Sequence, residues 1–150
     1  MELHPLVKKV LVKINFIERY RSLVSKHRRD SDFEYDEKVV LKLLDELGYQ
    51  AKYVKNGAFF KIIQKDRDYQ FQLNICLKYS CVELIFGLEK NKEMLEIAGP
   101  WGFVCDLLGN NEKIKVPIFG DYAEIKEILK DAFLIYEDYK KEMVMADLSS

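Results

Sequence analysis

The imidazoles and thiols are the side chains of this sequence whose chemistry best suits catalysis or metal binding. The chain contains two histidines, His4 and His27, and three cysteines, Cys76, Cys81 and Cys105. Their spacing forms neither an HExxH nor a CxxC pattern, so it predicts no tetrahedral zinc site and no Cys–His nucleophile. Each histidine is expected at the surface, one near the amino terminus and one at a helix end. We therefore expect no metal site and no enzyme activity.

The sequence also contains no phosphate-binding glycine pattern and no carboxylate pair suited to catalysis, which leads to the same expectation. The seven glycines are scattered at expected turns and form neither a P-loop nor a dinucleotide-binding fingerprint. Glu137 and Asp138 are adjacent in an expected helix, so they point in different directions and do not share a substrate. We expect no cofactor. An enzyme with an unrecognised small-molecule pocket between the sheet and its helices remains an alternative.

The cysteines and the amino-terminal residues indicate a cellular compartment. An odd number of cysteines without paired close spacing is typical of a reducing environment. Buried free thiols are expected, although Cys76 and Cys81 could also face each other across a hairpin. Lys8, Lys9 and Lys13 interrupt the early apolar residues, and no apolar run approaches the roughly 20 residues of a membrane span. These features predict a cytoplasmic protein without membrane association.

Charge is distributed unevenly along a chain that is nearly neutral overall. Its 150 residues are 49% hydrophobic and 33% charged, which fits a single α+β domain over residues 1–150. Residues 1–30 carry eight basic and three acidic side chains, whereas residues 121–150 carry four basic and eight acidic ones. Either the two terminal helices lie side by side on the sheet, or one end forms a charged docking surface.

Two hairpins are expected at the centre of the chain. Apolar residues at odd positions from Tyr69 to Tyr79 alternate with more polar ones, which is the period of a strand with one buried face. A second apolar run, 82–86, follows and predicts an antiparallel partner. Asn56-Gly57 favours a type I′ turn between strands in 49–55 and 58–64.

Three other segments have less regular patterns. Residues 94–97 are expected to add a short strand, and residues 103–108 fit either a strand or one or two helical turns. Pro117 restricts 113–119 to an edge strand or an extended connection. An exposed edge in this last segment could pair two chains, so the sequence leaves the oligomeric state open.

Helices are expected at both ends of the chain. One amphipathic helix is predicted over 5–26. A capping-box pattern at 31–34 predicts a second helix from about Phe33, which Gly48 ends. Asp121 is expected to cap a long final helix. The fold class is therefore α+β, with two N-terminal helices, a central antiparallel sheet of about four to six strands, and a long C-terminal helix.

The nine tyrosines predict a contact surface. They exceed what a core readily accommodates, because a buried phenol needs a hydrogen-bond partner, so several are expected to be exposed. Exposed tyrosines beside acidic residues are typical of protein–protein interfaces.

Two stretches of the carboxy-terminal half resemble a known class of proteins. GPWGFVCDLL at 99–108 and YEDYKK at 136–141 are similar to sequences of small bacterial proteins encoded beside polymorphic toxins. The size of the chain and its expected helix-helix-strands-helix order also resemble those of immunity proteins of contact-dependent growth inhibition systems. The resemblance implies a cytoplasmic, non-enzymatic protein that binds the carboxy-terminal domain of a delivered toxin, often a nuclease, and blocks its active site.

The partner-binding residues expected from this interpretation are Trp101, Glu137, Asp138 and Glu142. An acidic, tyrosine-bearing helix would complement the basic cleft of a nuclease.

A nucleic-acid-binding or regulatory module is the main alternative from another class. It would use Lys26, Arg28 and Arg29, and its affinity for DNA or RNA would fall steeply with salt. Because basic runs at helix ends are usually only solvated, nucleic acid is the less expected partner.

Overall fold

The strand β3 (Tyr69–Cys76) lies at the centre of a five-stranded antiparallel sheet with the order β1-β2-β3-β4-β5. Its register places Leu73 between Ile62 of β2 and Phe86 of β4. All three side chains are buried, because the period-two pattern directs them to the same face. Both expected hairpins are confirmed. The other strands are β1 (Lys52–Val54), β2 (Phe59–Asp66), β4 (Glu83–Lys90) and β5 (Glu93–Met94).

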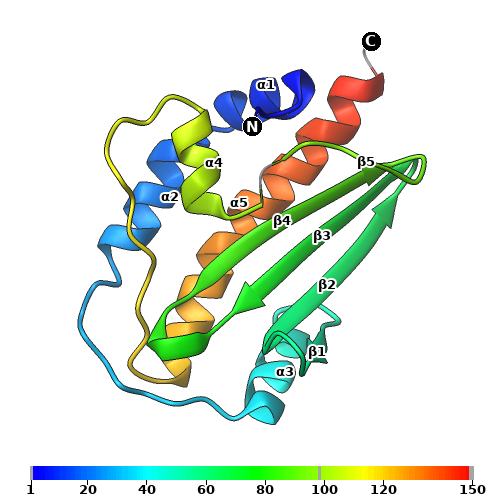
Figure 1. The fold of residues 1–150 in the computed structure, drawn as a ribbon. Helices are drawn as coiled ribbons and strands as arrows, with labels where there is room; N and C mark the ends of the chain where they lie inside the picture. The colour runs from blue at the N-terminus through cyan, green and yellow to red at the C-terminus, as the bar shows by residue number, and fades with distance from the viewer. Residues whose placement is uncertain (1, 98, 149–150) are drawn as a thin grey trace.

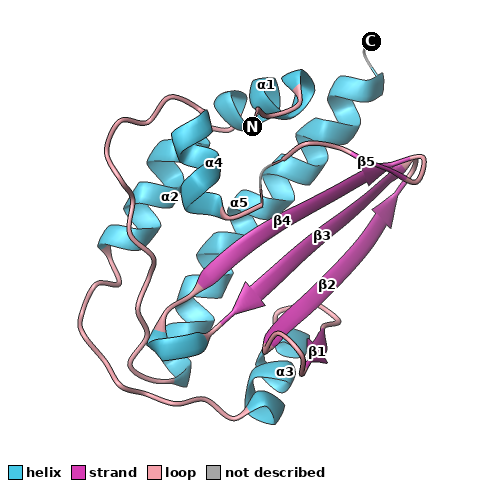
Figure 2. Ribbon diagram, viewed as in Figure 1, coloured by secondary structure: helices cyan, strands magenta, loops and turns pink. Residues whose placement is uncertain are grey.

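Helices cover one face of this sheet in the computed structural model, which describes residues 2–97 and 99–148 (Figure 1). The long helix α5 (Tyr122–Leu148) runs along that face, and α1, α2 and α4 lie on the same side (Figure 2). The α+β class, the antiparallel sheet and the long C-terminal helix are thus confirmed. The shorter helices are α1 (Pro5–Lys13), α2 (Phe16–Ser25), α3 (Glu37–Glu46) and α4 (Trp101–Leu107).

The first helix is interrupted, contrary to the prediction of one helix over 5–26. Asn15 has a left-handed backbone with φ of 61° and ψ of 45°, which separates α1 from α2. Asparagine tolerates this conformation better than most residues. The break lets α1 bury Val7 and Val10 while α2 directs Phe16 and Tyr20 toward Trp101. The change of direction at Asn15 thus allows both the burial of the α1 valines and the contact of the α2 aromatic rings with Trp101.

The second helix begins later than predicted. Ser31 Oγ accepts a hydrogen bond from Phe33 N, two residues on, so it forms a turn and does not cap a helix. The cap is Asp36, whose Oδ1 accepts from Lys38 N at 2.8 Å. Phe33 packs edge-on against Phe119, with ring centroids 6.0 Å apart, and this tertiary contact keeps the preceding chain extended. Gly48, with φ of 92°, follows the end of α3 as expected.

The turn between β1 and β2 also differs from the prediction. The positive φ of 52° belongs to Ala58, and neither Asn56 nor Gly57 has one, so the turn is not type I′. A Cβ on Gly57 would lie 2.6 Å from the ring of Phe59, so a larger residue here would require this partly exposed ring to move.

The carboxy-terminal connections are settled by backbone hydrogen bonds. Residues 103–108 lie mostly in α4, so the helical alternative is correct. Val82 N donates to Pro117 O at 2.9 Å, and Phe119 N donates to Ser80 O at 2.9 Å. Ile118 N donates to His27 O at 2.7 Å. The chain itself occupies these groups, so residues 117–119 belong to an extended connection, which is one of the two alternatives predicted for 113–119, and this part of the segment is not an edge free to pair two chains.

The cap of α5 agrees with the prediction. Glu124 N donates to Asp121 Oδ1 at 2.8 Å, and Glu124 Oε1 accepts from Gly120 N at 2.8 Å. No helix in the described ranges is both long and apolar enough to cross a membrane.

All three cysteines are free thiols. Cys105 is buried, whereas Cys76 and Cys81 are only half-buried, which corrects the expectation that all three are buried. Cys76 lies opposite Glu83 in the β3–β4 register, so Cys81 is not its cross-strand partner.

Burial of Cys105 predicts a loss of stability at alkaline pH. Burial, assisted by Asp106, raises the pKa of this thiol from 9.0 to about 12. Between these values the unfolded chain loses a proton that the folded chain retains, so stability falls as pH rises. The slope from this thiol is at most about 1.4 kcal/mol per pH unit. Urea unfolding of Cys105→Ala from pH 8 to pH 10.5 should show a shallower decline than the unmodified chain, and parallel declines would contradict the assignment.

Candidate functional site

The predicted acidic contacts on α5 are already paired within the chain. Glu142 Oε2 lies 2.7 Å from Lys13 Nζ, and Asp138 Oδ2 lies 2.8 Å from Arg19 Nη1. These pairs join α5 to the N-terminal helices, so the interpretation that the two terminal regions lie side by side explains much of their opposite charge.

Glu137, the third predicted acidic contact, also has partners within the chain. Its Oε2 accepts from the Tyr49 hydroxyl at 2.5 Å and lies 2.9 Å from Lys140 Nζ. Burial, together with this hydrogen bond to Glu137, raises the pKa of Tyr49 above its ordinary value. All three acidic side chains would have to exchange these contacts for contacts with a partner.

Trp101 is a core residue, which corrects its predicted place on a contact surface. Its side chain is 0% exposed. The indole stacks on Phe86 at a centroid distance of 5.0 Å and meets Phe16 edge-on at 5.2 Å. The backbone at Gly99, with φ of 86°, turns the chain so that α4 directs the indole inward.

His27 is buried as well, contrary to its expected surface position. Its Nδ1 lies 2.7 Å from Glu124 Oε2, and the side chain of this histidine is 4% exposed. Glu124 therefore caps α5 with one carboxylate oxygen and holds His27 with the other. This arrangement fastens the end of α2 to the start of α5, which is a structural role.

The three basic residues of the nucleic-acid alternative are exposed, but their contacts differ. Arg28 Nη1 donates to Val116 O at 2.7 Å. Lys26 lines a groove between α2 and α5 that also contains Asp131. Arg29 forms no hydrogen bond or ion pair with another residue of the described ranges.

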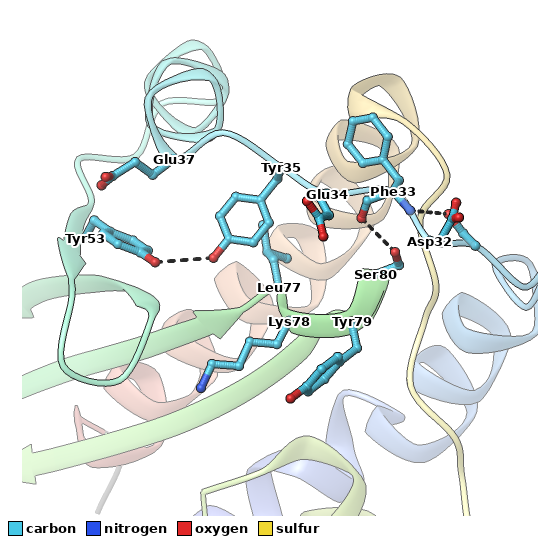
Figure 3. A pocket seen from close by; sticks show the side chains of 11 residues that line it. Asp32, Phe33, Glu34, Tyr35, Glu37, Tyr53, Leu77, Lys78, Tyr79 and Ser80 are labelled. Atoms are coloured by element: carbon cyan, nitrogen blue, oxygen red, sulfur yellow. Dashed lines mark hydrogen bonds between the residues drawn. The ribbon is translucent and has the colours of Figure 1, made fainter.

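A pocket of about 740 Å³ lies between the segment 31–37 and the turn that joins β3 to β4 (Figure 3). Residues 31–36 are the extended chain that precedes α3, and Glu37 is the first residue of that helix. The turn contains the short 3₁₀ helix η1 (Lys78–Ser80). Aromatic and acidic side chains predominate in the lining, which consists of Ser31, Asp32, Phe33, Glu34, Tyr35, Glu37, Tyr53, Leu77, Lys78, Tyr79 and Ser80.

Tyr79 occupies an unusual position in this turn. Its side chain is 92% exposed, and its backbone is left-handed, with φ of 58° and ψ of 35°. Ser80, the next residue, also has φ of 58°. For a residue with a Cβ this conformation costs about 1–2 kcal/mol, so surrounding contacts must hold it in place.

Ser80 supplies those contacts. It is 2% exposed, and its Oγ donates to Phe33 O at 2.7 Å. Its own carbonyl accepts from Phe119 N, and Cys81 N closes the turn on Lys78 O at 3.1 Å. The turn is therefore fixed to both neighbouring segments, and it presents the ring of Tyr79 to solvent.

The carboxylates that line the pocket differ from those on α5. Asp32, Glu34 and Glu37 form no ion pair with any residue in the described part of the chain, whereas Lys78 supplies one positive charge. The lining thus carries three negative charges and one positive charge, a net charge of about −2 at neutral pH.

Two tyrosines form the wall opposite the turn. The hydroxyls of Tyr35 and Tyr53 lie 3.5 Å apart. Burial, reinforced by this hydroxyl pair, raises the pKa of Tyr35 above its ordinary value. Like an ordinary tyrosine, it is neutral at physiological pH, so its phenol keeps a hydrogen to donate.

Sequence reasoning missed this pocket because it placed Tyr79 in the buried series of β3. The strand ends at Cys76, and the alternation stops before Tyr79. Tyr35 was likewise expected inside a helix. The residues Lys78 to Cys81 between two strands are a turn-length segment, which is the signal that favours exposure of Tyr79.

Replacing Tyr79 tests whether its backbone is strained. Glycine adopts the left-handed conformation without a Cβ clash, so Tyr79→Gly should raise the free energy of unfolding by about 0.5–1 kcal/mol. Tyr79→Ala keeps the Cβ and should change it by no more than about 0.5 kcal/mol. Urea unfolding of both variants measures the difference, and equal stabilities would contradict the strain.

No family model matches this sequence, and comparison with curated proteins and with solved structures yields no match. Within the described residues, no group of three or more His, Cys, Asp or Glu side chains could hold a metal ion. The candidate site is therefore the pocket lined by residues 31–35, 37, 53 and 77–80, hereafter the Tyr79 pocket.

Proposed function

We propose that this chain is a binding protein that covers a surface of another protein, and that the Tyr79 pocket lies at the centre of the contact. The observation that carries the proposal is the 92% exposure of Tyr79 on a turn that Ser80 holds in a strained conformation. Aromatic side chains are enriched among the residues that dominate interface energies. Strained backbone persists where the surroundings hold it, often at binding sites.

The partner we propose is the toxic domain of a polymorphic toxin, with this chain as its immunity-type inhibitor. The resemblance of the stretches at 99–108 and 136–141 to immunity proteins motivates this assignment. The unpaired carboxylates Asp32, Glu34 and Glu37 support it, since a nuclease cleft is basic and opposite charges speed and orient association. The acidic residues of α5 remain a competing contact surface.

Co-expression tests the proposal. Each gene adjacent to the gene for this chain is expressed in a bacterial host, alone and together with this chain. One product should arrest growth, and this chain should restore growth and co-purify with that product in equal amounts. Tyr79→Ala should restore growth less well, whereas Glu112→Gln, at an exposed site outside the pocket, should act like the unmodified chain. Failure to find any adjacent product that is both toxic and neutralised would reject the immunity assignment.

A further inference from the structure

We infer that the Tyr79 pocket binds the guanidinium group of an arginine side chain that the partner inserts. This inference rests on the proposed function, because it names the chemistry that the same surface recognises. A volume of about 740 Å³ lies within the range of small-ligand pockets, so it admits one side chain together with its flanking backbone.

Aromatic rings supply the first part of the recognition. Tyr35 and Tyr53 form one wall, and Tyr79 borders the pocket from the turn across from them, with its ring directed away from this pair in the view of Figure 3. Leu77 also borders the pocket, but it is buried in the core and adds little apolar surface. A cation over an aromatic face gains electrostatic energy, and the planar guanidinium can also stack on such a ring.

Carboxylates supply the second part. Glu34 lies between Phe33 and Tyr35, and Glu37 lies beside Tyr53, so two negative charges flank the tyrosine pair (Figure 3). Neither glutamate has a basic partner among the described residues, in contrast to Asp138 and Glu142 on α5. A cation entering the pocket therefore does not have to displace an existing ion pair.

The arrangement favours arginine over lysine. Guanidinium carries five N–H donors in a plane, so it can bond to a carboxylate and a phenol oxygen at once. The ammonium of lysine is a more strongly hydrated point charge with three donors. Lys78 adds a positive charge at the turn, which repels an incoming cation. A guanidinium with several hydrogen bonds can offset this repulsion better than an ammonium with fewer.

Small probes test the inference without the partner. Acetyl-arginine-amide is titrated into the full chain, and backbone amide shifts are followed by NMR. Acetyl-citrulline-amide, which is similar in shape but neutral, and acetyl-lysine-amide serve as comparisons. We expect saturable shifts at 31–37 and 77–80 with the arginine probe in the millimolar range, at least about fivefold weaker binding of lysine, and no saturation with citrulline.

Two double variants with the same change in net charge separate a local effect from a general one. Glu34→Gln with Glu37→Gln should weaken binding of the arginine probe by about fivefold or more. Glu93→Gln with Glu112→Gln removes two charges outside the pocket and should leave the binding constant within twofold.

Equal binding of arginine and citrulline, equal effects of the two double variants, or shifts confined to other surfaces would overturn the arginine assignment. None of these results depends on a toxin partner. A failed probe titration with successful co-expression would therefore reject only the guanidinium chemistry. A successful titration without any neutralised adjacent product would reject the immunity role and retain the pocket.

Discussion

Replacement of Trp101 by alanine is expected to lower the free energy of unfolding by about 3–5 kcal/mol. The indole is 0% exposed and touches rings from α2 and β4, so alanine would leave a cavity where these elements and α4 meet. Urea or thermal unfolding of Trp101→Ala measures the loss. A variant too unstable to fold would be replaced by Trp101→Phe, which keeps part of the ring volume and should cost less.

Phe103 provides the matched control on the same helix. It is 42% exposed, so Phe103→Ala removes an aromatic ring of α4 that is only partly packed and should cost about 1 kcal/mol or less. If Trp101→Ala kept full stability and instead lost affinity for a partner, the placement of Trp101 in the core would be contradicted.

Replacement of Tyr79 by alanine is expected to reduce affinity for the partner identified by co-expression about 30-fold, or about 2 kcal/mol. The ring is almost wholly exposed in the free chain, so its removal should hardly affect stability. The loss therefore reports on the complex alone. Isothermal titration calorimetry gives the affinity, and unfolding of the same preparation shows that the fold is intact.

Two comparisons make this result specific. Tyr79→Phe keeps the ring and should retain most of the affinity if stacking matters more than the hydroxyl. Charge reversal of Glu137, Asp138 and Glu142 tests the competing surface on α5, but it also breaks contacts with Tyr49, Lys140, Arg19 and Lys13. Its stability must therefore be measured beside its affinity. Full binding by Tyr79→Ala with loss of binding in the folded α5 variant would place the interface on α5.

Much of the fold follows from local sequence. The alternation from Tyr69 to Cys76 specifies a strand with one buried face because successive side chains point to opposite sides of a sheet. The carboxylate of Asp121 caps α5 by accepting a hydrogen bond from Glu124 N, three residues further along the chain. Gly48 follows the end of α3 because glycine readily adopts the positive φ needed there. Each signal acts within a few residues, which is why it can be predicted without the rest of the chain.

The breaks in helices required the tertiary structure. The pattern over 5–26 is continuous, yet the chain turns at Asn15, and this turn lets α2 pack against α4 while both α1 and α2 pack against α5. The capping signal at Ser31 is likewise present, but burial of Phe33 against Phe119 and Tyr122 outweighs one more turn of helix. A local preference for helix is worth about 1 kcal/mol, and packing of an aromatic ring can contribute a similar or larger free energy, so it can override that preference.

The sequence by itself determined the α+β plan and the strand faces. The expectation that several tyrosines reach the surface is wrong, because five of the nine are buried and Tyr79 is the one fully exposed tyrosine among the described residues. Only the tertiary structure decided which aromatic residues do so: Trp101 is enclosed by α2, α4 and β4, and Tyr79 is projected by a turn that Ser80 holds against Phe33. It also decided which carboxylates are free, since Asp138 pairs with a residue far away in the chain and Glu34 does not. Exposure and pairing depend on contacts between distant segments, and no local pattern encodes them.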